Sequence, residues 1–260
     1  METIELQIEE QIIEVLKNSW HDHDETVLPP MFHGTDAALI GLTKAERDQL
    51  NAMCESIINP LVKLYEDNSI GMLKMDNRLF ESRDSHGSSA WAYYFAKQRT
   101  ENSSLYSYGD FYVTNEPNRA VGYSSEAWIF GETGWTTNRL IEGAKALGLD
   151  LPDDDAFRRA FQSFEIQKQK SKTPVVLMVI NGSSSKLFLE GGTNIREDCD
   201  SPEEFSKKIQ SIKDNMTSTS SYRYDIQSLE ENQKIYLIKQ DSFSNLECAW
   251  KNLSKLREKY

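Results

Sequence analysis

The amino-acid sequence predicts an α+β fold, and three features carry that prediction. The 260-residue chain is 38% hydrophobic and 10% aromatic, enough apolar surface to bury a sizeable core. Helical periodicity dominates the first half, and short strand-like runs dominate the second. Helices and strands are therefore segregated, which is unlike a doubly wound sheet. We expect a single domain over 1–260, with a helical N-terminal part over 1–108 that includes an insertion near 43–100.

The first half is expected to be mainly helical. Apolar residues at helical spacing predict a helix over 5–20. A capping box of Thr43 and Glu46 opens a second helix, with a bend expected near Pro60. A proline suited to the first turn begins the helix after the second strand of this half. The remaining expected elements are strands over 31–35 and 111–114 and helices over 117–128, 136–147 and 154–168.

The second half is expected to supply most of the sheet. The run PVVLMVI at 174–180 is continuously apolar, which is typical of a strand buried on both faces. Ser201, Pro202 and Glu204 are typical of a helix start. The other expected elements are strands over 186–190, 222–226 and 234–239 and a last helix capped by Ser244 and Glu247.

Charge and cysteine content limit the classes of partner. The net charge is −12 and the pI about 4.9, so nucleic acid and anionic lipid are disfavoured overall. The cysteines Cys54, Cys199 and Cys248 are far apart and form no CxxC pair, which indicates neither disulfides nor a zinc site. The acidic N-terminus lacks the features of a secretion signal, and no apolar window reaches membrane-spanning length. We expect no membrane association and a cytoplasmic protein, whether made in that cytosol or delivered to it.

Three short motifs follow one another along the first half of the chain. They are Phe32-His33-Gly34-Thr35, the segment 108–114 (YGDFYVT) and the segment 118–124 (NRAVGYS). Tyr112 and Tyr123 lie eleven positions apart. Together the motifs resemble ADP-ribosyltransferases of the diphtheria-toxin and poly(ADP-ribose) polymerase type, the His-Tyr-Glu class. Those enzymes carry a His-Gly-Ser/Thr strand, then a Gly-x-x-Tyr strand, then a helix with an Ala and a second Tyr.

The resemblance implies a fold, a substrate and a site. The fold would be a split pair of small antiparallel sheets around an NAD cleft, with flanking helices. Tyr112 and Tyr123 would sandwich the cationic nicotinamide ring between aromatic faces. His33 would bond a ribose hydroxyl, and Gly34 and Thr35 would approach the nicotinamide amide. NAD is thus the expected cofactor, consumed as a substrate, and no metal is expected.

The family's third element is a glutamate at the start of a late strand. The segment 222–239 resembles the terminal hairpin that bears it, and counting back places the position at Ser220 or Ser221. Neither residue is a carboxylate, so Ser221 fills the third catalytic position in this alignment. Another register would instead use Asp225, Glu230 or Glu231.

Each motif also has a structural interpretation. A lone histidine or tyrosine is more often a packing residue than a ligand-binding one. The loop residues His21, Asp22, His23 and Asp24 could bind a metal, but four adjacent ligands rarely converge on one ion, which favours a solvated loop. The aromatic patch over 91–95, which contains Trp91, Tyr93, Tyr94 and Phe95, could stack bases, but core packing or a wall of the cleft is favoured.

The function expected from the resemblance is mono-ADP-ribosyl transfer from NAD to a macromolecule. Protein is slightly favoured over RNA or DNA as acceptor because the chain is acidic. By analogy with the family, the context would be a bacterial toxin, an effector or a phage-defence enzyme, with an antitoxin or immunity protein as a possible partner. The alternatives are an NAD glycohydrolase and a catalytically inactive NAD- or ADP-ribose-binding module.

Overall fold

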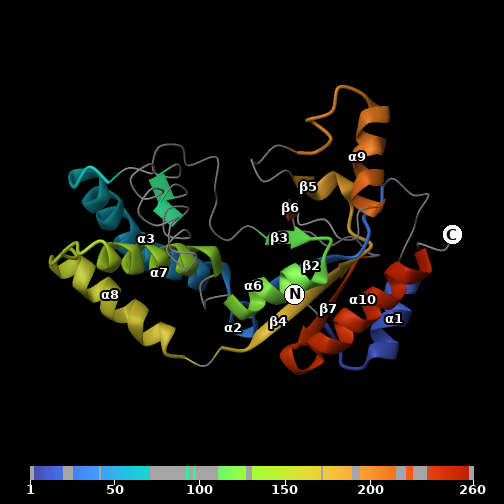
Figure 1. Ribbon diagram of the computed structural model, residues 1–260, viewed down its shortest axis with the longest axis horizontal. Helices are drawn as coiled ribbons and strands as arrows, with labels where there is room; N and C mark the ends of the chain where they lie inside the picture. Colours follow the sequence, from blue (N-terminus) through green and yellow to red (C-terminus); the bar gives the residue numbers. More distant parts are fainter. Residues whose placement is uncertain are drawn as a thin grey trace. The chain divides into compact units, whose positions relative to one another are not determined.

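The computed structural model divides the chain into two compact units (Figure 1). The sheet unit comprises Met1–Ile40, Asp110–Ala127 and Thr173–Tyr260, and the helical unit comprises Gly41–Gly109 and Trp128–Lys172. The structure describes residues 3–19, 26–40, 42–70, 92, 93, 96, 97, 111–126, 131–170, 172–188, 194–214, 221–224 and 233–257. Where we expected one domain with an insertion near 43–100, the chain forms two units, and the helical one takes in two separate segments.

The sheet unit is built on one mixed sheet of the described strands. Its strands are β1 (Ile4–Leu6), β2 (Met31–Asp36), β3 (Phe111–Thr114), β4 (Pro174–Ile180), β5 (Leu187–Phe188), β6 (Ser221–Tyr224) and β7 (Lys234–Lys239). Their order across the sheet is β1-β7-β4-β2-β3-β6-β5. The β1–β7 pair is parallel and the other pairs are antiparallel. β4 lies near the middle with all seven residues buried, as its unbroken apolar run predicts.

The sheet is nearly divided between β2 and β3. β2 pairs with β4 over six positions, from Met31↔Val179 to Asp36↔Pro174. By contrast, β2 pairs with β3 at one position only, Phe32↔Thr114. The α+β class is therefore confirmed, whereas the expected pair of separate antiparallel sheets was wrong. The described strands form one sheet whose two halves meet at a single residue pair.

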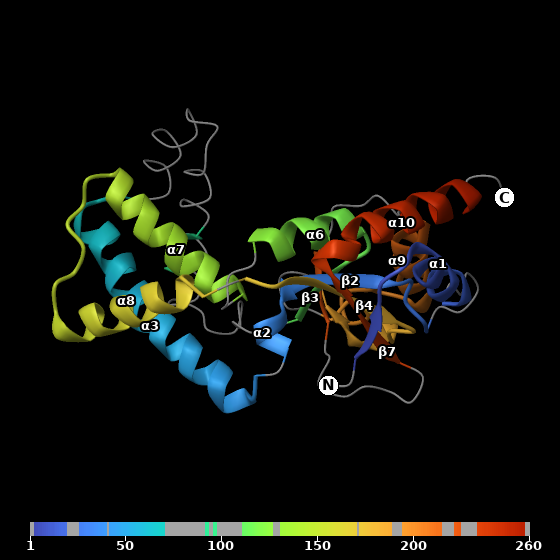
Figure 2. The same ribbon diagram turned by 90° about the horizontal axis from the view of Figure 1, so that it is seen from below.

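Helices cover both faces of this sheet. The helical elements of the unit are α1 (Glu9–Asn18), α2 (Ala37–Ile40), α6 (Pro117–Glu126), η1 (Ser184–Lys186), α9 (Pro202–Asp214), η2 (Gln240–Ser242) and α10 (Phe243–Arg257). α1, α6 and α10 pack on the face that includes Phe32, against which the ring of Trp250 stands edge-on at a centroid distance of 5.1 Å. α9 packs on the face that includes Met31 and Val113. Figure 2 shows α6 and α10 running along one side of the strands.

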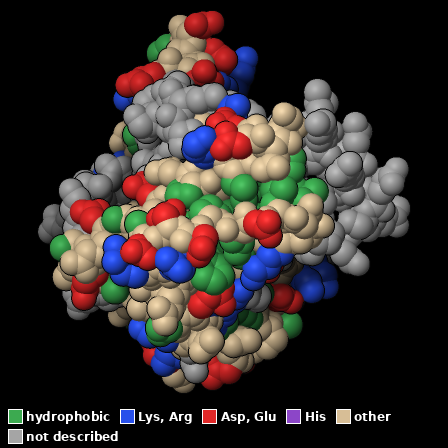
Figure 3. All heavy atoms as spheres, turned by 90° about the vertical axis from the view of Figure 1, so that its left-hand side faces the viewer, with side chains coloured by type: hydrophobic (Ala, Val, Ile, Leu, Met, Phe, Trp, Pro, Cys, Tyr) green, Lys and Arg blue, Asp and Glu red, His purple; other side chains and the backbone are tan. Residues whose placement is uncertain are grey.

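The helical unit has its own core. The helices described over their full length in this unit are α3 (Lys44–Asp67), α7 (Gly131–Ala146) and α8 (Asp155–Lys168). The capping box of Thr43 and Glu46 is confirmed at the start of α3, which continues as one helix through Pro60. Buried residues such as Ile57, Leu140 and Phe164 pack together at its centre. Figure 3 shows the side of the molecule at the left of Figure 1, where hydrophobic side chains lie among acidic and basic ones.

Several expected boundaries differ from the observed ones. A short strand, β1, precedes the first helix, which begins at Glu9 rather than near residue 5. α7 begins at Gly131, before the expected start, and ends ahead of Gly148, whose φ of 68° suits glycine. The strand expected over 186–190 is described only at Leu187–Phe188. α10 begins at Phe243, so Ser244 lies inside the helix instead of capping it.

Candidate functional site

The His-Gly-Thr motif lies in the middle of β2. Its neighbours Met31 and Phe32 are buried and anchor the strand in the two cores on either face of the sheet. Thr35 is 7% exposed, and Asp36 is 1% exposed. The Asp36 carboxylate accepts hydrogen bonds from the main-chain N–H groups of Ala38 and Thr173, each at 2.8 Å. These hydrogen bonds fix the C-terminal end of β2, directly after the His-Gly-Thr motif.

His33 connects β2 to the strand that carries Tyr112. The Nδ1 atom of His33 lies 2.6 Å from the main-chain carbonyl oxygen of Tyr112, although the residues are 79 positions apart in sequence. Burial lowers the pKa of His33 to about 4, and the hydrogen bond to Tyr112 opposes that shift only in part. The imidazole is therefore neutral at pH 7. Since a carbonyl oxygen can only accept, Nδ1 carries the ring proton, and Nε2 is the acceptor nitrogen of the ring.

Gly34 allows helix α6 to rest directly on β2. A Cβ atom at this position would lie 2.6 Å from the main-chain nitrogen of Ser124 and 2.8 Å from the carbonyl carbon of Ala120, and nearer still to the Ala120 oxygen. No side chain fits at such distances, and the obstructing atoms belong to the backbone. Glycine is therefore required here by the close approach of the helix. This contact brings the third motif, at 118–124, onto the first.

The main chain of Gly34 faces the place where the sheet divides. Ala37 donates its N–H to the carbonyl of Thr173 at 2.9 Å, which extends the β2–β4 register by one position. Main-chain groups along an antiparallel strand point alternately to its two neighbours, so the N–H and C=O of Gly34 point away from β4 and toward β3. In register, Gly34 would pair with Tyr112, but the β2–β3 pairing ends at Phe32↔Thr114. The main-chain N–H and C=O of Gly34 are therefore not part of the β2–β3 ladder.

Tyr112 and Tyr123 both belong to the face of the sheet covered by α6. Thr114 pairs with Phe32 and shares its face, and Tyr112 lies two residues along the same strand. Tyr112 is partly buried, whereas Tyr123 is 46% exposed on α6, one residue before the Ser124 that contacts Gly34. Tyr123 is thus not a core-packing residue. Its exposed ring belongs to the helix whose main chain contacts Gly34 at Ala120 and Ser124.

Arg119 lies within the third motif, but the resemblance gave it no role. Its Nε and Nη2 atoms donate to the Tyr123 hydroxyl at 3.1 Å and 3.0 Å, and its guanidinium carbon lies 5.5 Å from the centre of the Tyr123 ring. The two residues are four positions apart on α6, the spacing at which helical side chains meet. That spacing was the signal in the sequence that could have found this residue.

Ser221 lies on the strand next to the one that carries Tyr112. β6 begins at Ser221 and pairs antiparallel with β3, so that Ser221 is opposite Thr114 and Arg223 is opposite Tyr112. The expected terminal hairpin was wrong, because β6 pairs with β3 and β5 whereas β7 pairs with β4 and β1. The buried strand β4 needs a hydrogen-bonding partner on each side, and β7 takes that place. Ser220, Asp225, Glu230 and Glu231 lie outside the described residues.

The structure describes only part of the other candidate clusters. Tyr93 is 3% exposed and packs against Tyr65 in the core of the helical unit, as the packing interpretation predicted. Trp91, Tyr94 and Phe95 and the loop His21-Asp22-His23-Asp24 lie outside the described residues. Within the described ranges, no group of three or more potential metal ligands converges. None of the helices that the structure describes has the length and apolarity of a membrane span.

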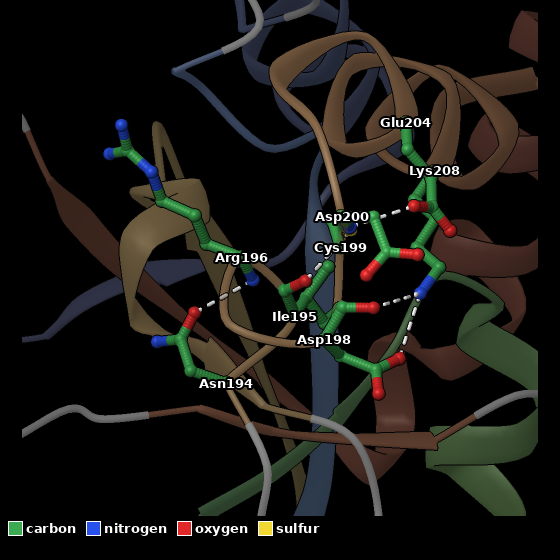
Figure 4. Close-up of polar contacts among 8 residues, drawn as sticks. All are labelled: Asn194, Ile195, Arg196, Asp198, Cys199, Asp200, Glu204 and Lys208. Carbon is green, nitrogen blue, oxygen red and sulfur yellow. Dashed lines mark hydrogen bonds and ion pairs between the residues drawn. The ribbon is translucent and has the colours of Figure 1, made fainter.

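A polar network before α9 holds a loop in place (Figure 4). The Lys208 ammonium bonds the Asp198 carboxylate at 2.8 Å, and this contact raises the pKa of the lysine. The Cys199 thiol donates to the carbonyl of Ile195 at 3.0 Å, and the main-chain N–H of Asp200 donates to the Glu204 carboxylate at 2.9 Å. These groups satisfy one another within the loop and the first turns of α9, so the cluster is a structural anchor.

The fold and the site define an α+β protein whose sheet divides beside a histidine, a glycine and two tyrosines. Comparison with protein-family models, with curated proteins and with solved structures finds no match for the chain. Function must therefore be inferred from the residues and their geometry.

Proposed function

We propose that this protein binds NAD at the division of the sheet and transfers its ADP-ribose to a macromolecular acceptor. One observation carries the proposal. Three motifs that are separate in sequence meet at one place, through the His33–Tyr112 hydrogen bond and the contact of Gly34 with Ala120 and Ser124. That meeting point lies where β2 and β3 stop pairing. It supports the ADP-ribosyltransferase-like site that the motifs resemble.

Each residue has a role that its chemistry supports. The rings of Tyr112 and Tyr123 would stack on the cationic nicotinamide, and the main chain of Gly34 would bond its amide. The neutral His33 would accept a hydrogen bond from a ribose hydroxyl through Nε2, which suits a hydroxyl and disfavours a carbonyl or phosphate oxygen as partner. Thr35, buried one position further along β2, would support the strand beside the ligand.

The reaction needs positioning more than acid–base chemistry. The glycosidic bond between nicotinamide and ribose breaks, the electron pair leaves with neutral nicotinamide, and an acceptor nucleophile attacks the cationic ribose carbon and loses its proton. Holding the ring and the ribose in fixed orientation lowers the entropic part of this barrier. A carboxylate near the ribose would further stabilise the positive charge.

The position of Ser221 supports a second candidate function. The resemblance places the stabilising carboxylate at 220 or 221, and β6 begins with Ser221 at that point. Without the carboxylate, transfer would be slow and limited to single additions. A weak NAD glycohydrolase, with water as acceptor, or an inactive NAD- or ADP-ribose-binding module would then be the function.

The acceptor and the biological context follow from analogy and charge. Protein is favoured over RNA or DNA because the chain carries a net charge of −12. A toxin, an effector or a phage-defence enzyme is the setting in which a compact transferase of this kind would act, and an antitoxin or immunity protein is the partner that would restrain it.

The test is incubation with NAD labelled in its adenylate phosphate, together with cell lysate. Labelled macromolecule indicates a transferase, free labelled ADP-ribose indicates a glycohydrolase, and NAD binding without turnover indicates a binding module. Protease and nuclease treatment of the labelled product then identifies the acceptor class.

A pair of variants connects the result to the site. His33→Ala should lower labelling on the order of a hundredfold while the protein remains folded, because a hydrogen bond to the reacting ribose is lost. Arg158→Gln is the control, since Arg158 lies on α8 of the helical unit and pairs with Asp155. Wild-type turnover by a folded His33→Ala protein would remove His33 from the site.

A further inference from the structure

The Arg119–Tyr123 pair on α6 has a feature that the stacking role of Tyr123 does not use. Two of the five N–H donors of the Arg119 guanidinium are directed at the Tyr123 hydroxyl. Within the described part of the chain, no carboxylate lies within ion-pair distance of Arg119, whereas Arg139 contacts one carboxylate and Arg158 contacts two. A cation held by a tyrosine, with its other donors directed elsewhere, is suited to bind an anion.

The position of Arg119 matches the position of a particular anion. The Arg119 guanidinium carbon lies 5.5 Å from the centre of the Tyr123 ring, and its Nε and Nη2 atoms bond the hydroxyl of that ring. In NAD, one ribose separates the nicotinamide ring from the diphosphate. A dinucleotide whose ring stacks on Tyr123 can therefore place its diphosphate beside this guanidinium. Arg119 is also nearer the amino end of α6, where the helix dipole favours negative charge.

We propose that Arg119 binds the diphosphate of NAD and that the Tyr123 hydroxyl positions its guanidinium for this contact. The inference rests on the proposed NAD site and adds a binding residue to it. Tyr123 then has two separate parts, a ring that stacks on the nicotinamide and a hydroxyl that orients the arginine. A phosphate of a nucleic-acid acceptor would present the same chemistry to Arg119, so the experiment must distinguish the two sources.

The experiment compares the binding of four probes by calorimetry. NAD carries both ring and diphosphate, nicotinamide riboside carries the ring alone, inorganic pyrophosphate carries the phosphates alone, and a short single-stranded oligonucleotide represents the acceptor. Arg119→Gln should weaken NAD and pyrophosphate on the order of tenfold or more, and leave nicotinamide riboside unchanged. Arg119→Lys should lose less, because it keeps the charge, and Arg158→Gln should change none of the four.

A measurement on the unaltered protein gives the same information without a variant. The affinity for NAD should fall as sodium chloride rises, because an exposed charge contact is screened, whereas the affinity for nicotinamide riboside should not. Tyr123→Phe should lower NAD affinity less than Arg119→Gln does. The double variant should lose less than the sum of the two, because both changes act on one contact.

The outcomes separate this inference from the proposed function. If the unaltered protein binds NAD and Arg119→Gln binds it equally well, Arg119 is not a diphosphate ligand although the NAD site stands. If Arg119→Gln weakens only the oligonucleotide, the phosphate belongs to an acceptor and the diphosphate assignment is overturned. If Arg119-dependent pyrophosphate binding occurs without NAD binding, a phosphate site exists and the proposed function fails. If neither is bound, both proposals fall.

Discussion

Gly34 gives the most direct test of how the site is assembled. In Gly34→Ala, the new methyl group would meet the Ser124 nitrogen at 2.6 Å and the Ala120 carbonyl carbon at 2.8 Å. These atoms belong to the backbone of α6 and cannot rotate away, so the helix would have to move off β2. Overpacking of this kind costs about 1 to 3 kcal/mol, and the rigid obstruction places Gly34→Ala near 3 kcal/mol.

The magnitude can be measured by thermal unfolding. A loss of about 3 kcal/mol corresponds to a fall in Tm of roughly 6 to 12 °C for a chain of this size. Gly122→Ala is the matched control, because a methyl group added at Gly122, on α6 itself, meets nothing within 4 Å. Replacing a helical glycine with alanine there should raise stability by roughly 0.5 to 1 kcal/mol.

The two variants should therefore shift Tm in opposite directions. Gly34→Ala should also lose NAD binding beyond its loss of stability, because its methyl group displaces the α6 turn that carries Tyr123. An unchanged Tm and unchanged NAD affinity in Gly34→Ala would show that α6 does not rest on Gly34, and the assembly of the three motifs at one site would be wrong.

Three further predictions concern individual side chains. The pKa of His33 lies near 4 when folded and near 6.5 when unfolded, so below pH 6.5 the unfolded state binds a proton that the folded state does not. The free energy of unfolding should thus fall from pH 6.5 toward pH 4, by roughly 3 kcal/mol at most. Urea midpoints measured across this pH range should fall less steeply in His33→Gln than in the wild type. Equal slopes would show that His33 is not the group responsible for the fall. Tyr123→Ala should weaken NAD binding by roughly 1 to 2 kcal/mol, and by more than Tyr123→Phe does, as measured by calorimetry. A lower Tm without a change in NAD affinity would show instead that Tyr123 is a packing residue. Ser221→Glu should raise turnover of labelled NAD if position 221 faces the ribose, and Ser220→Glu should raise it if position 220 does. If neither variant raises turnover and Glu230→Gln or Glu231→Gln abolishes it, the third element has a different register.

Local patterns predicted most of the elements correctly. The apolar run of β4, the capping box at Thr43 and the proline that starts α6 each depend on residues close together in sequence, and each was confirmed. β1 was missed because three residues are too few to establish an alternating pattern. The capping role expected of Ser244 was wrong, because a capping serine and an interior serine look alike without the backbone geometry.

Pairing between distant strands could not be obtained in this way. β6 and β7 follow each other in sequence and look like a hairpin, yet they occupy different halves of the sheet. Alternation along a strand shows which residues share a face but says nothing about which strand lies alongside. Which strand pairs with β4 and which with β3 depends on the relative stability of all the possible strand pairings.

For the candidate site too, the sequence indicated the residues and the tertiary structure decided their contacts. The motifs and the eleven-residue spacing from Tyr112 to Tyr123 indicated which residues belong to it. Folding added the bond from His33 to the Tyr112 carbonyl, the burial that keeps the imidazole neutral, and the resting of α6 on Gly34. These depend on contacts between residues about 80 to 90 positions apart, because solvent exclusion and close packing arise only when distant segments meet.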